Sequence, residues 1–205
     1  MSRYTGPRLK KMRALGLDLP GLSRKSIERR PSPPGVQGAG GRRRKKSAYG
    51  MQLLEKQKIR YNYGISERQL RRLVTEARAS REETGGKLLQ LLERRLDNVV
   101  YRAGLAPTIP SARQLVNHGH IRLNGHKADI ASIRVATGDQ ITIRERSQKL
   151  DVIQAALADA DSRDGRPGWL SFDNGKISIQ ALPENDSVQF ELDVQQVIEF
   201  YSRMM

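Results

Sequence analysis

Residues 112–125 read ARQLVNHGHIRLNG, and the pattern predicts a helix followed at once by a sharp corner. Ser111 stands just before the stretch and Gln114 three residues later, which is the spacing of a capping box, so we expect a helix to start at Ser111. Gly119 supplies the left-handed backbone on which helices commonly end. These signals predict a short helix that stops at this glycine.

A small sheet is predicted to follow the corner. Ile121 and Leu123 alternate with polar residues, which is the pattern of a strand with one buried face. Asn124-Gly125 is a strong signal for a tight hairpin turn. Residues 139–146, DQITIRER, alternate in the same way. Helix, corner and sheet together predict one compact unit.

The polar side of this predicted unit carries hydrogen-bond donors and cations, with no carboxylate among them. Donors of this kind, together with the free amides of a helix start such as Ser111, match RNA that is recognised through its phosphates and 2′-hydroxyls. We therefore predict an RNA-binding face that includes Arg113, Gln114, Asn117, His118, His120, Arg122 and Lys127.

All three histidines of the chain, His118, His120 and His126, lie close together, which raises the alternatives of a metal site or a catalytic site. A zinc site is normally supported by carboxylates, and Asp129 is the only acid nearby. No Ser or Cys nucleophile forms a motif with a histidine and an acid, and no Gly-rich phosphate loop is present. We expect no catalytic residue, metal or cofactor, and interpret the histidines as hydrogen-bonding groups that face RNA.

The charge of the chain indicates a polyanionic partner. The 205 residues carry a net charge of +15, and counting along the chain gives +12 for residues 1–50, +9 for 51–150 and −6 for 151–205. A field of this sign favours nucleic acid first and an anionic membrane surface second. No apolar run approaches the roughly 20 residues that span a bilayer, so we expect no membrane partner. The absence of cysteine excludes disulfides, thiolate catalysis and cysteine-ligated zinc.

Three helices are predicted before the compact unit. Residues 47–64 are the first, and residues 66–80 are the second, which opens with a capping box formed by Ser66 and Gln69. Residues 85–104 have the strongest apolar stripe in the chain and are predicted to form one continuous helix.

The remaining segments complete a plan of four parts in an α+β protein. Residues 1–46 are predicted to be a basic extended arm, residues 47–92 a helical domain, residues 93–150 an inserted small RNA-binding module, and residues 151–205 an acidic C-terminal segment. In this last segment we expect a hairpin around Asn174-Gly175 and a closing helix, which pack back on the helices or face a protein neighbour.

The arm contains the polar stretch RRPSPPGVQGAGGRRRKK, residues 29–46. Such a stretch cannot bury enough apolar surface to offset its ordering entropy, so alone it is expected to be disordered or extended. The alternatives are a solvated charge run, a localisation signal, or an arm that orders on phosphate. We favour the arm, with contacts from Arg42, Arg43, Arg44, Lys45 and Lys46.

At this point the residues resemble a known family. Residues 91–125, LLERRLDNVVYRAGLAPTIPSARQLVNHGHIRLNG, are similar to the RNA-binding module named after protein four of the small ribosomal subunit. The start, SRYTGPRLKKMRALGLDLPGL, and the stretch YGISERQLRRLVTEA resemble the ribosomal proteins of that family themselves. The resemblance covers essentially the whole chain. The module alone would be less specific, because several RNA enzymes share it.

The resemblance implies a structural protein that binds small-subunit rRNA early, nucleates assembly of the subunit body and influences decoding accuracy. It also implies ribosomal proteins five and twelve as neighbours, a position near the messenger RNA entry path, and a location in cytoplasmic or plastid ribosomes. Carried over to this chain, the RNA-facing motif includes Asn124, and Arg94 and Arg95 begin the module. In the N-terminal stretch we expect RNA contacts from Arg3, Tyr4, Arg8, Lys10 and Lys11.

The chain departs from the family pattern where many bacterial relatives carry a zinc-binding cysteine cluster. The Pro/Gly-rich stretch that stands there resembles cysteine-free versions from cyanobacteria and plastids.

The rival function is an RNA-modifying enzyme, or another RNA-binding factor, that uses the same module. A pseudouridine synthase uses an aspartate in a motif like Arg95-Leu96-Asp97. We instead interpret Asp97 as a helix-surface acid paired with an arginine. Too few residues follow the module for a catalytic domain.

Overall fold

The computed structural model describes residues 4–35, 47–161, 166–173, 175–184 and 187–204. The chain divides into two compact units. The helical unit comprises residues 1–88 and 188–205, and the sheet unit comprises residues 89–187. The expected α+β class is confirmed, because the first unit consists of helices and the second combines helices with an antiparallel sheet. Among the described residues, no helix is long and apolar enough to cross a membrane.

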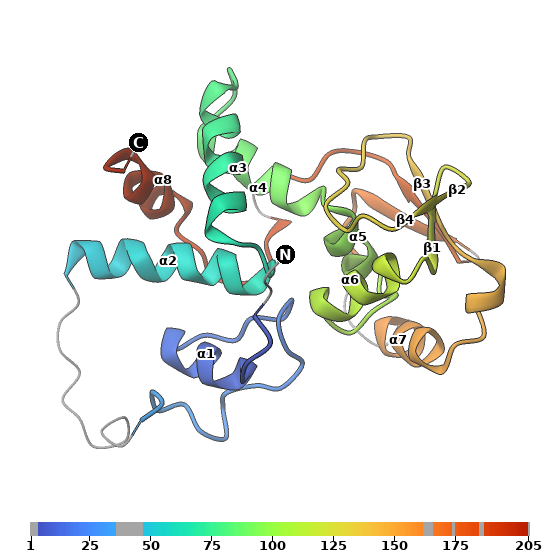
Figure 1. Cartoon of the computed structure of the whole chain (residues 1–205), viewed down its shortest axis with the longest axis horizontal. Helices are drawn as coiled ribbons and strands as arrows, with labels where there is room; N and C mark the ends of the chain where they lie inside the picture. Colours follow the sequence, from blue (N-terminus) through green and yellow to red (C-terminus); the bar gives the residue numbers. More distant parts are fainter. Residues whose placement is uncertain (1–3, 36–46, 162–165, 174, 185–186, 205) are drawn as a thin grey trace. The chain divides into compact units, whose positions relative to one another are not determined.

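Three helices build the body of the helical unit: α2 (Ala48–Asn62), α3 (Glu67–Ala79) and α8 (Val194–Ser202). The predicted capping box is confirmed, because the Ser66 side chain accepts from the Gln69 amide and the Gln69 side chain accepts from the Ser66 amide. Helix α8 packs against both α2 and α3, so the end of the chain completes this core (Figure 1).

A group of polar side chains, here called the Glu67 cluster, fixes α8 to α2 and α3. The Tyr201 hydroxyl donates to Glu67 at 2.6 Å. The same carboxylate forms ion pairs with Lys56 at 3.1 Å and Arg60 at 3.4 Å. Burial acts to raise the pKa of Glu67, but the hydrogen bonds from Tyr201 and Lys56 outweigh it and lower this pKa below its ordinary value. Burial, and then the neighbouring Glu67, raise the pKa of Tyr201.

The N-terminal region is folded where the structure describes it. Helix α1 (Arg8–Leu15) ends at Gly16, whose φ is 75°. Met12, Leu19 and Leu22 form a small core of their own, and Tyr61 of α2 packs against it. Residues 4–35 of the predicted arm are therefore not extended throughout, because they contain a helix and a small apolar core that packs against Tyr61 of α2. Residues 36–46 of that arm lie outside the described residues.

The helix predicted over residues 85–104 is interrupted. Helix α4 (Thr84–Glu93) ends before Arg95, whose ψ of 136° is extended, and α5 (Leu96–Arg102) begins directly after it. The Leu96 amide donates to the Ile133 carbonyl at 2.8 Å, and the Val135 amide donates to the Arg94 carbonyl at 2.9 Å. Residues 133 and 135, which are distant in sequence, thus form hydrogen bonds with backbone groups of residues 94 and 96 that a continuous helix would have used within itself.

The sheet unit holds five antiparallel strands in the order β2-β1-β3-β5-β4. The strands are β1 (Ile121–Leu123), β2 (His126–Ala128), β3 (Gln140–Ile143), β4 (Leu170–Asp173) and β5 (Lys176–Ile179). The same unit contains helices α5, α6 (Ile109–Asn117) and α7 (Asp151–Asp161), and the short 3-10 helix η1 (Glu145–Ser147). In the register, Leu123 lies opposite Ile141 and Ile141 opposite Ile177. One face of the sheet is therefore apolar, while the other is left to polar side chains.

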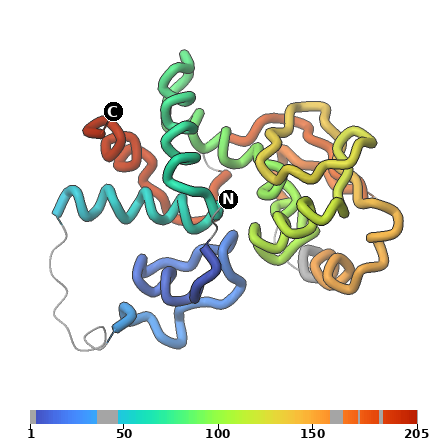
Figure 2. Tube along the Cα trace, in the orientation of Figure 1, coloured from blue at the N-terminus to red at the C-terminus, as the bar shows by residue number. Residues whose placement is uncertain are grey.

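The expected acidic C-terminal segment is split between the two units. The predicted hairpin forms as β4 and β5, and β5 pairs with β3, so the hairpin extends the sheet of the module. Trp169 at its start is 7% exposed. Only α8 joins the helical unit, where Figure 2 traces it in red beside α2. Local alternation predicts a strand pair, but the third strand it joins lies about 35 residues away along the chain.

Candidate nucleic-acid interface

Helix α6 carries most of the predicted RNA-binding residues, and it begins earlier than expected. Its cap is Thr108, whose hydroxyl accepts from the Ser111 amide at 3.3 Å, so the helix starts at Ile109 rather than at Ser111. Pro110 is tolerated there because the first helical amides have no partner within the helix. The amide of Ser111, which was predicted to be available for phosphate, is therefore occupied by Thr108.

The corner after α6 is held by backbone and side-chain hydrogen bonds. The His120 amide donates to the Leu115 carbonyl at 3.0 Å, and the Arg144 amide donates to the His120 carbonyl at 2.8 Å. Nδ1 of His120 lies 2.9 Å from the hydroxyl oxygen of buried Ser147, in a hydrogen bond. His120 thus ties α6 to β3 and η1, which makes it a positioning residue for the corner.

His118 and Lys127 lie at the same corner but face solvent. His118 caps the C-terminal end of α6, and its ring centre is 6.0 Å from that of His120. Gly119 has a φ of 73°, and a Cβ added there would lie 2.8 Å from Cε of Lys127. The glycine therefore allows both the turn and the close approach of this lysine. Two exposed groups that can reach an anion are brought together in this way.

Asp97 organises the inner side of the corner. It is fully buried, and it accepts hydrogen bonds from Arg95 at 2.9 and 3.1 Å and from Arg113 at 2.6 and 2.9 Å. Its expected arginine pairing is confirmed, but its expected place on the helix surface is wrong. Because Arg95 and Arg113 direct their guanidinium groups at this buried acid, both support the fold of the unit. We call these three residues the Asp97 cluster.

Asn124 also has a structural role at the β1–β2 turn. Its φ of 51° is positive, and asparagine tolerates this conformation better than most residues. Its side chain accepts from the Gln140 amide and donates to Asp139, each at 2.8 Å. The turn is therefore fixed to the start of β3, and the Asn124 side chain is engaged in this contact.

A row of cations crosses the polar face of the sheet. In the register, Arg122 lies opposite Lys127 on one side and Thr142 on the other, and Thr142 lies opposite Lys176. Arg122, Lys127 and Lys176 are exposed. Arg122 and Lys127 are like charges on directly opposed strands, which destabilises the isolated sheet and would be relieved by a bound polyanion, whereas Lys176 lies opposite Thr142 on one side and Asp173 on the other. We call Arg122, Lys127 and Lys176 the basic row.

The remaining residues predicted on this face are either exposed or half-buried. Gln114 and Asn117 are exposed on α6, as an RNA contact requires. Arg94 is half-buried, and its Nε donates to the Val135 carbonyl at 2.7 Å. Lys176 and the exposed Arg144 and Arg146 were missed. The alternation in DQITIRER was the available signal for Arg144, whereas Lys176 required knowledge of strand pairing.

The predicted contacts in the helical unit are partly engaged within the protein. The ammonium of Lys11 lies 5.2 Å from the ring centre of Tyr4 and 5.0 Å from that of Tyr61. Arg8 donates to the Leu22 carbonyl at 3.3 Å, whereas Lys10 is exposed. Six further predicted residues lie outside the described residues: Arg3, Arg42, Arg43, Arg44, Lys45 and Lys46.

The chemistry of this surface is that of binding. Within the described ranges, no three histidine, aspartate or glutamate side chains gather as they would around a metal ion. The groups on the corner and the basic row are cations and neutral donors, which suit phosphate and 2′-hydroxyl oxygens.

Comparison with protein families gives two adjoining matches. The model described as ribosomal protein S4/S9 N-terminal domain matches residues 3–93, and the S4 domain model matches residues 94–141. The boundary between them falls at the interruption between α4 and α5. The second match covers the corner, strands β1 and β2 and the first half of β3, but not the hairpin that extends the sheet.

Full-length relatives have the same extent. The chain is 56% identical over 207 residues to small ribosomal subunit protein uS4 of Methylobacillus flagellatus, and 57% identical over 209 residues to uS4B of Nitrosomonas europaea, with 100% of each chain covered. Identity to uS4 of Nostoc punctiforme, a cyanobacterium, is 48% over 205 residues, with 99% of each chain covered. The comparison therefore does not favour the cyanobacterial version that the Pro/Gly-rich stretch resembled.

Proposed function

This chain belongs to the family of small ribosomal subunit protein uS4, and we propose that it is a structural constituent of the small ribosomal subunit that binds small-subunit rRNA. The observation that carries the RNA contact is the basic row beside the corner. Arg122, Lys127 and Lys176 share one exposed sheet face, and His118 lies at the adjoining corner. Phosphate contacts of this kind dominate affinity for nucleic acid.

Several finer statements belong to the same proposal. The protein is a primary binder that nucleates assembly of the subunit body, contributes to translational accuracy and works in cytoplasmic ribosomes. Its protein neighbours are small-subunit proteins five and twelve, and messenger RNA passes near it. The family resemblance of the whole chain supports these statements.

The rival function, RNA modification, is disfavoured by the state of Asp97. An aspartate that attacks a base must reach its substrate and have a free carboxylate. Asp97 is fully buried and is bound by two guanidinium groups. The only aspartate that resembles a catalytic motif is thus a structural residue here.

Two measurements test the proposal. In a cell extract, the tagged chain is expected to co-sediment with small ribosomal subunits, and recovery only in free-protein fractions would contradict it. With purified small-subunit rRNA, log affinity is expected to fall linearly with log salt, by roughly 0.7–0.9 for each phosphate contacted.

The basic row can be tested within the same salt series. Arg122→Gln is expected to lower the salt slope by about 0.7–0.9. Arg203→Gln is the matched control, because Arg203 is also exposed but lies at the end of α8. Equal slopes for these two variants would exclude Arg122 as a phosphate contact.

A further inference from the structure

The corner between α6 and β1 contains a side chain whose charge changes near neutral pH. His118 is exposed at the C-terminal end of α6, and its ring centre lies 6.0 Å from that of His120. The side chain of histidine ordinarily gains its charge between about pH 5 and 8, whereas arginine and lysine stay charged over this whole range. The positive charge at the corner therefore depends on pH.

The charged side chain that packs closest to this corner is a cation. Lys127 of β2 passes Gly119, because a Cβ at this glycine would lie 2.8 Å from Cε of the lysine. Asp129 lies 3.4 Å from Lys127 and is its ion-pair partner. Within the described ranges, no carboxylate forms an ion pair with His118. A protonated ring at this position is thus available to an anion from outside the protein.

The chain that follows β3 borders the same corner. The Arg144 amide donates to the His120 carbonyl at 2.8 Å, and the side chains of Arg144, Glu145 and Arg146 are exposed there. The two arginines repel a further positive charge, whereas Glu145 and the C-terminal dipole of α6, which ends at His118, attract it. A bound anion would add its own attraction for a protonated ring.

A phosphate group favours the protonated form of histidine for two reasons. The protonated ring donates from both nitrogens, whereas the neutral ring has one donor and one acceptor, and the acceptor repels a phosphate oxygen. Hydrogen bonds between two ionised groups are also about twice as strong as those between neutral groups. A phosphate held by His118 and Lys127 together would in addition offset the repulsion between the two cations.

We infer that RNA binding at the corner is coupled to protonation of His118, so that the complex holds a proton on this ring and affinity depends on pH. This inference rests on the proposed function in taking rRNA as the ligand, and it adds a control on affinity. Because the charged form binds, the contribution is fully present below the titration range of histidine and is lost as the pH rises through it. His120, tied to Ser147 through Nδ1, shapes the corner instead.

The test measures binding of the full chain to purified small-subunit rRNA in salt series at about pH 5.5 and about pH 7.5, on either side of the ordinary value for histidine. The salt slope of the wild type is expected to be steeper at the lower pH by roughly 0.7–0.9, because one more phosphate is neutralised. Affinity at a fixed salt concentration is expected to rise by roughly threefold to tenfold.

Two variants fix the charge of the ring position. His118→Gln is neutral at both pH values and is expected to show the shallow slope at both. His118→Lys is charged at both and is expected to show the steep slope at both. Circular dichroism of each variant checks that the fold is intact.

His126→Gln is the matched control, because it removes an exposed histidine from the other face of the sheet. In the register, His126 lies opposite Leu123, whereas the basic row runs through the neighbouring pair Arg122 and Lys127. This variant is expected to keep the pH dependence of the wild type.

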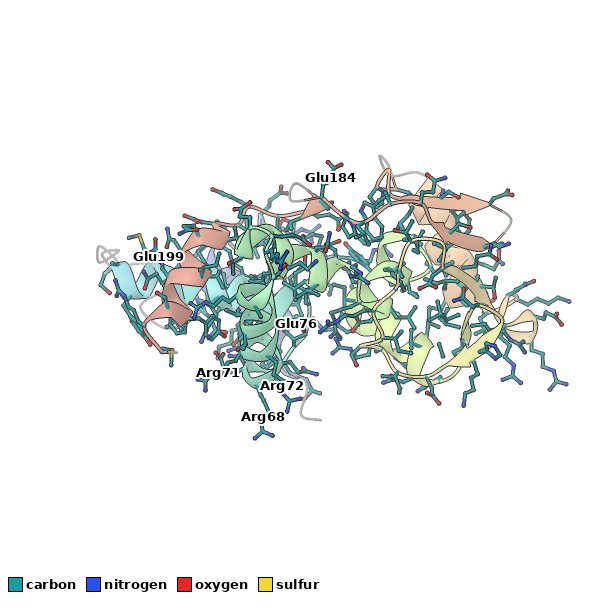
Figure 3. The ribbon with its side chains drawn as sticks, turned by 90° about the horizontal axis from the view of Figure 1, so that it is seen from above. Arg68, Arg71, Arg72, Glu76, Glu184 and Glu199 are labelled. Carbon is teal, nitrogen blue, oxygen red and sulfur yellow. The ribbon has the colours of Figure 1, made fainter. Side chains whose placement is uncertain are left out.

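Permanent cations give a constant background in these measurements. Arginine stays charged at both pH values, so exposed arginines such as Arg68, Arg71 and Arg72 of α3, which Figure 3 shows pointing away from the ribbon, do not make the salt slope depend on pH. Calorimetry in two buffers of different ionisation enthalpy counts the protons taken up on binding. The wild type is expected to take up more protons than His118→Gln does.

Equal salt slopes of the wild type at the two pH values would overturn the coupling. A pH dependence that persists in His118→Gln would assign the proton to another group and also overturn it. Failure of the wild type to bind rRNA at either pH would contradict the proposed function itself, so the two failures are distinguishable.

Discussion

Each unit has a carboxylate where its helices meet, and the two carboxylates differ in their access to water. Asp97 in the sheet unit is fully buried and bound by two arginines. The Glu67 side chain in the helical unit is 36% exposed, and its partners are Lys56, Arg60 and Tyr201. Water screens the second cluster but not the first, so similar ion pairs carry different weight.

The difference teaches where each unit is vulnerable. Removing one member of a buried ion pair leaves an uncompensated charge that water cannot reach, whereas a half-exposed group is rehydrated. The sheet unit, which carries the corner and the basic row, therefore depends on buried acids: Asp97, and Glu93, which pairs with the buried side chain of Arg102 at 3.4 Å. The helical unit distributes the attachment of α8 among a hydrogen bond, two ion pairs and apolar packing.

The largest effect is expected from Asp97→Asn, which keeps the side-chain shape but removes its charge. The guanidinium groups of Arg95 and Arg113 then lose the buried negative charge that they both contact, and we expect a loss of about 3–5 kcal/mol in the free energy of unfolding. Urea denaturation followed by fluorescence measures it, because the one tryptophan, Trp169, is buried in the sheet unit.

Asp129→Asn provides the control for this prediction in the same unit. Asp129 lies 3.4 Å from Lys127, but its side chain is 52% exposed, and such pairs contribute less than about 1 kcal/mol. If the two variants lowered the free energy of unfolding equally, the claim that the buried carboxylate contributes more than the exposed one would be refuted.

A smaller effect is expected from Tyr201→Phe in the Glu67 cluster. The variant keeps the ring but removes the hydrogen bond to Glu67, and bonds to a charged group contribute about 1.5–3 kcal/mol, of which partial solvation leaves about 1–2. Hydrogen exchange of the α8 amides reports this loss, since Trp169 lies in the other unit. Tyr49→Phe removes a hydroxyl from a tyrosine that is 55% exposed and is expected to leave exchange unchanged.

The smallest effect is a pH dependence of α8. The pKa of Glu67 in the folded protein lies below its ordinary value of 4.5, so the ionised carboxylate stabilises the fold. That contribution is fully present above about pH 4.5 and is lost as the pH falls through the lowered folded value. Hydrogen exchange of α8, corrected for its intrinsic pH dependence, is expected to accelerate in this window, and Glu67→Gln is expected to remove the acceleration. A pH dependence that persists in this variant would assign it to another group.

Local signals predicted the parts of the fold that depend on local interactions. Ser66 and Gln69 identified the start of α3, and Asn124-Gly125 identified the turn between β1 and β2. In each of these cases the residues that determine the conformation are neighbours in sequence. The α+β class followed from the same periodicities.

Long-range pairing explains what was missed. The break at Arg95 is made by backbone hydrogen bonds to residues 133 and 135, and nothing in the apolar stripe of residues 85–104 indicates it. Arg113 looked like a free cation because its partner, Asp97, is 16 residues away. Of the residues predicted to contact RNA, Arg122 is exposed, as such a contact requires, whereas Arg95 and Arg113 pair with an acid inside the unit.

The division of the helical unit between both ends of the chain has a consequence for biosynthesis. Residues 1–88 leave the ribosome first, but α8, which covers α2 and α3, emerges only after the whole sheet unit. The surface that α8 buries, around Glu67 and Lys56, therefore stays exposed to solvent until the 99 intervening residues, 89–187, have been translated. The unit that begins first is thus completed last, and the sheet unit can present its basic row to RNA before its own protein is finished.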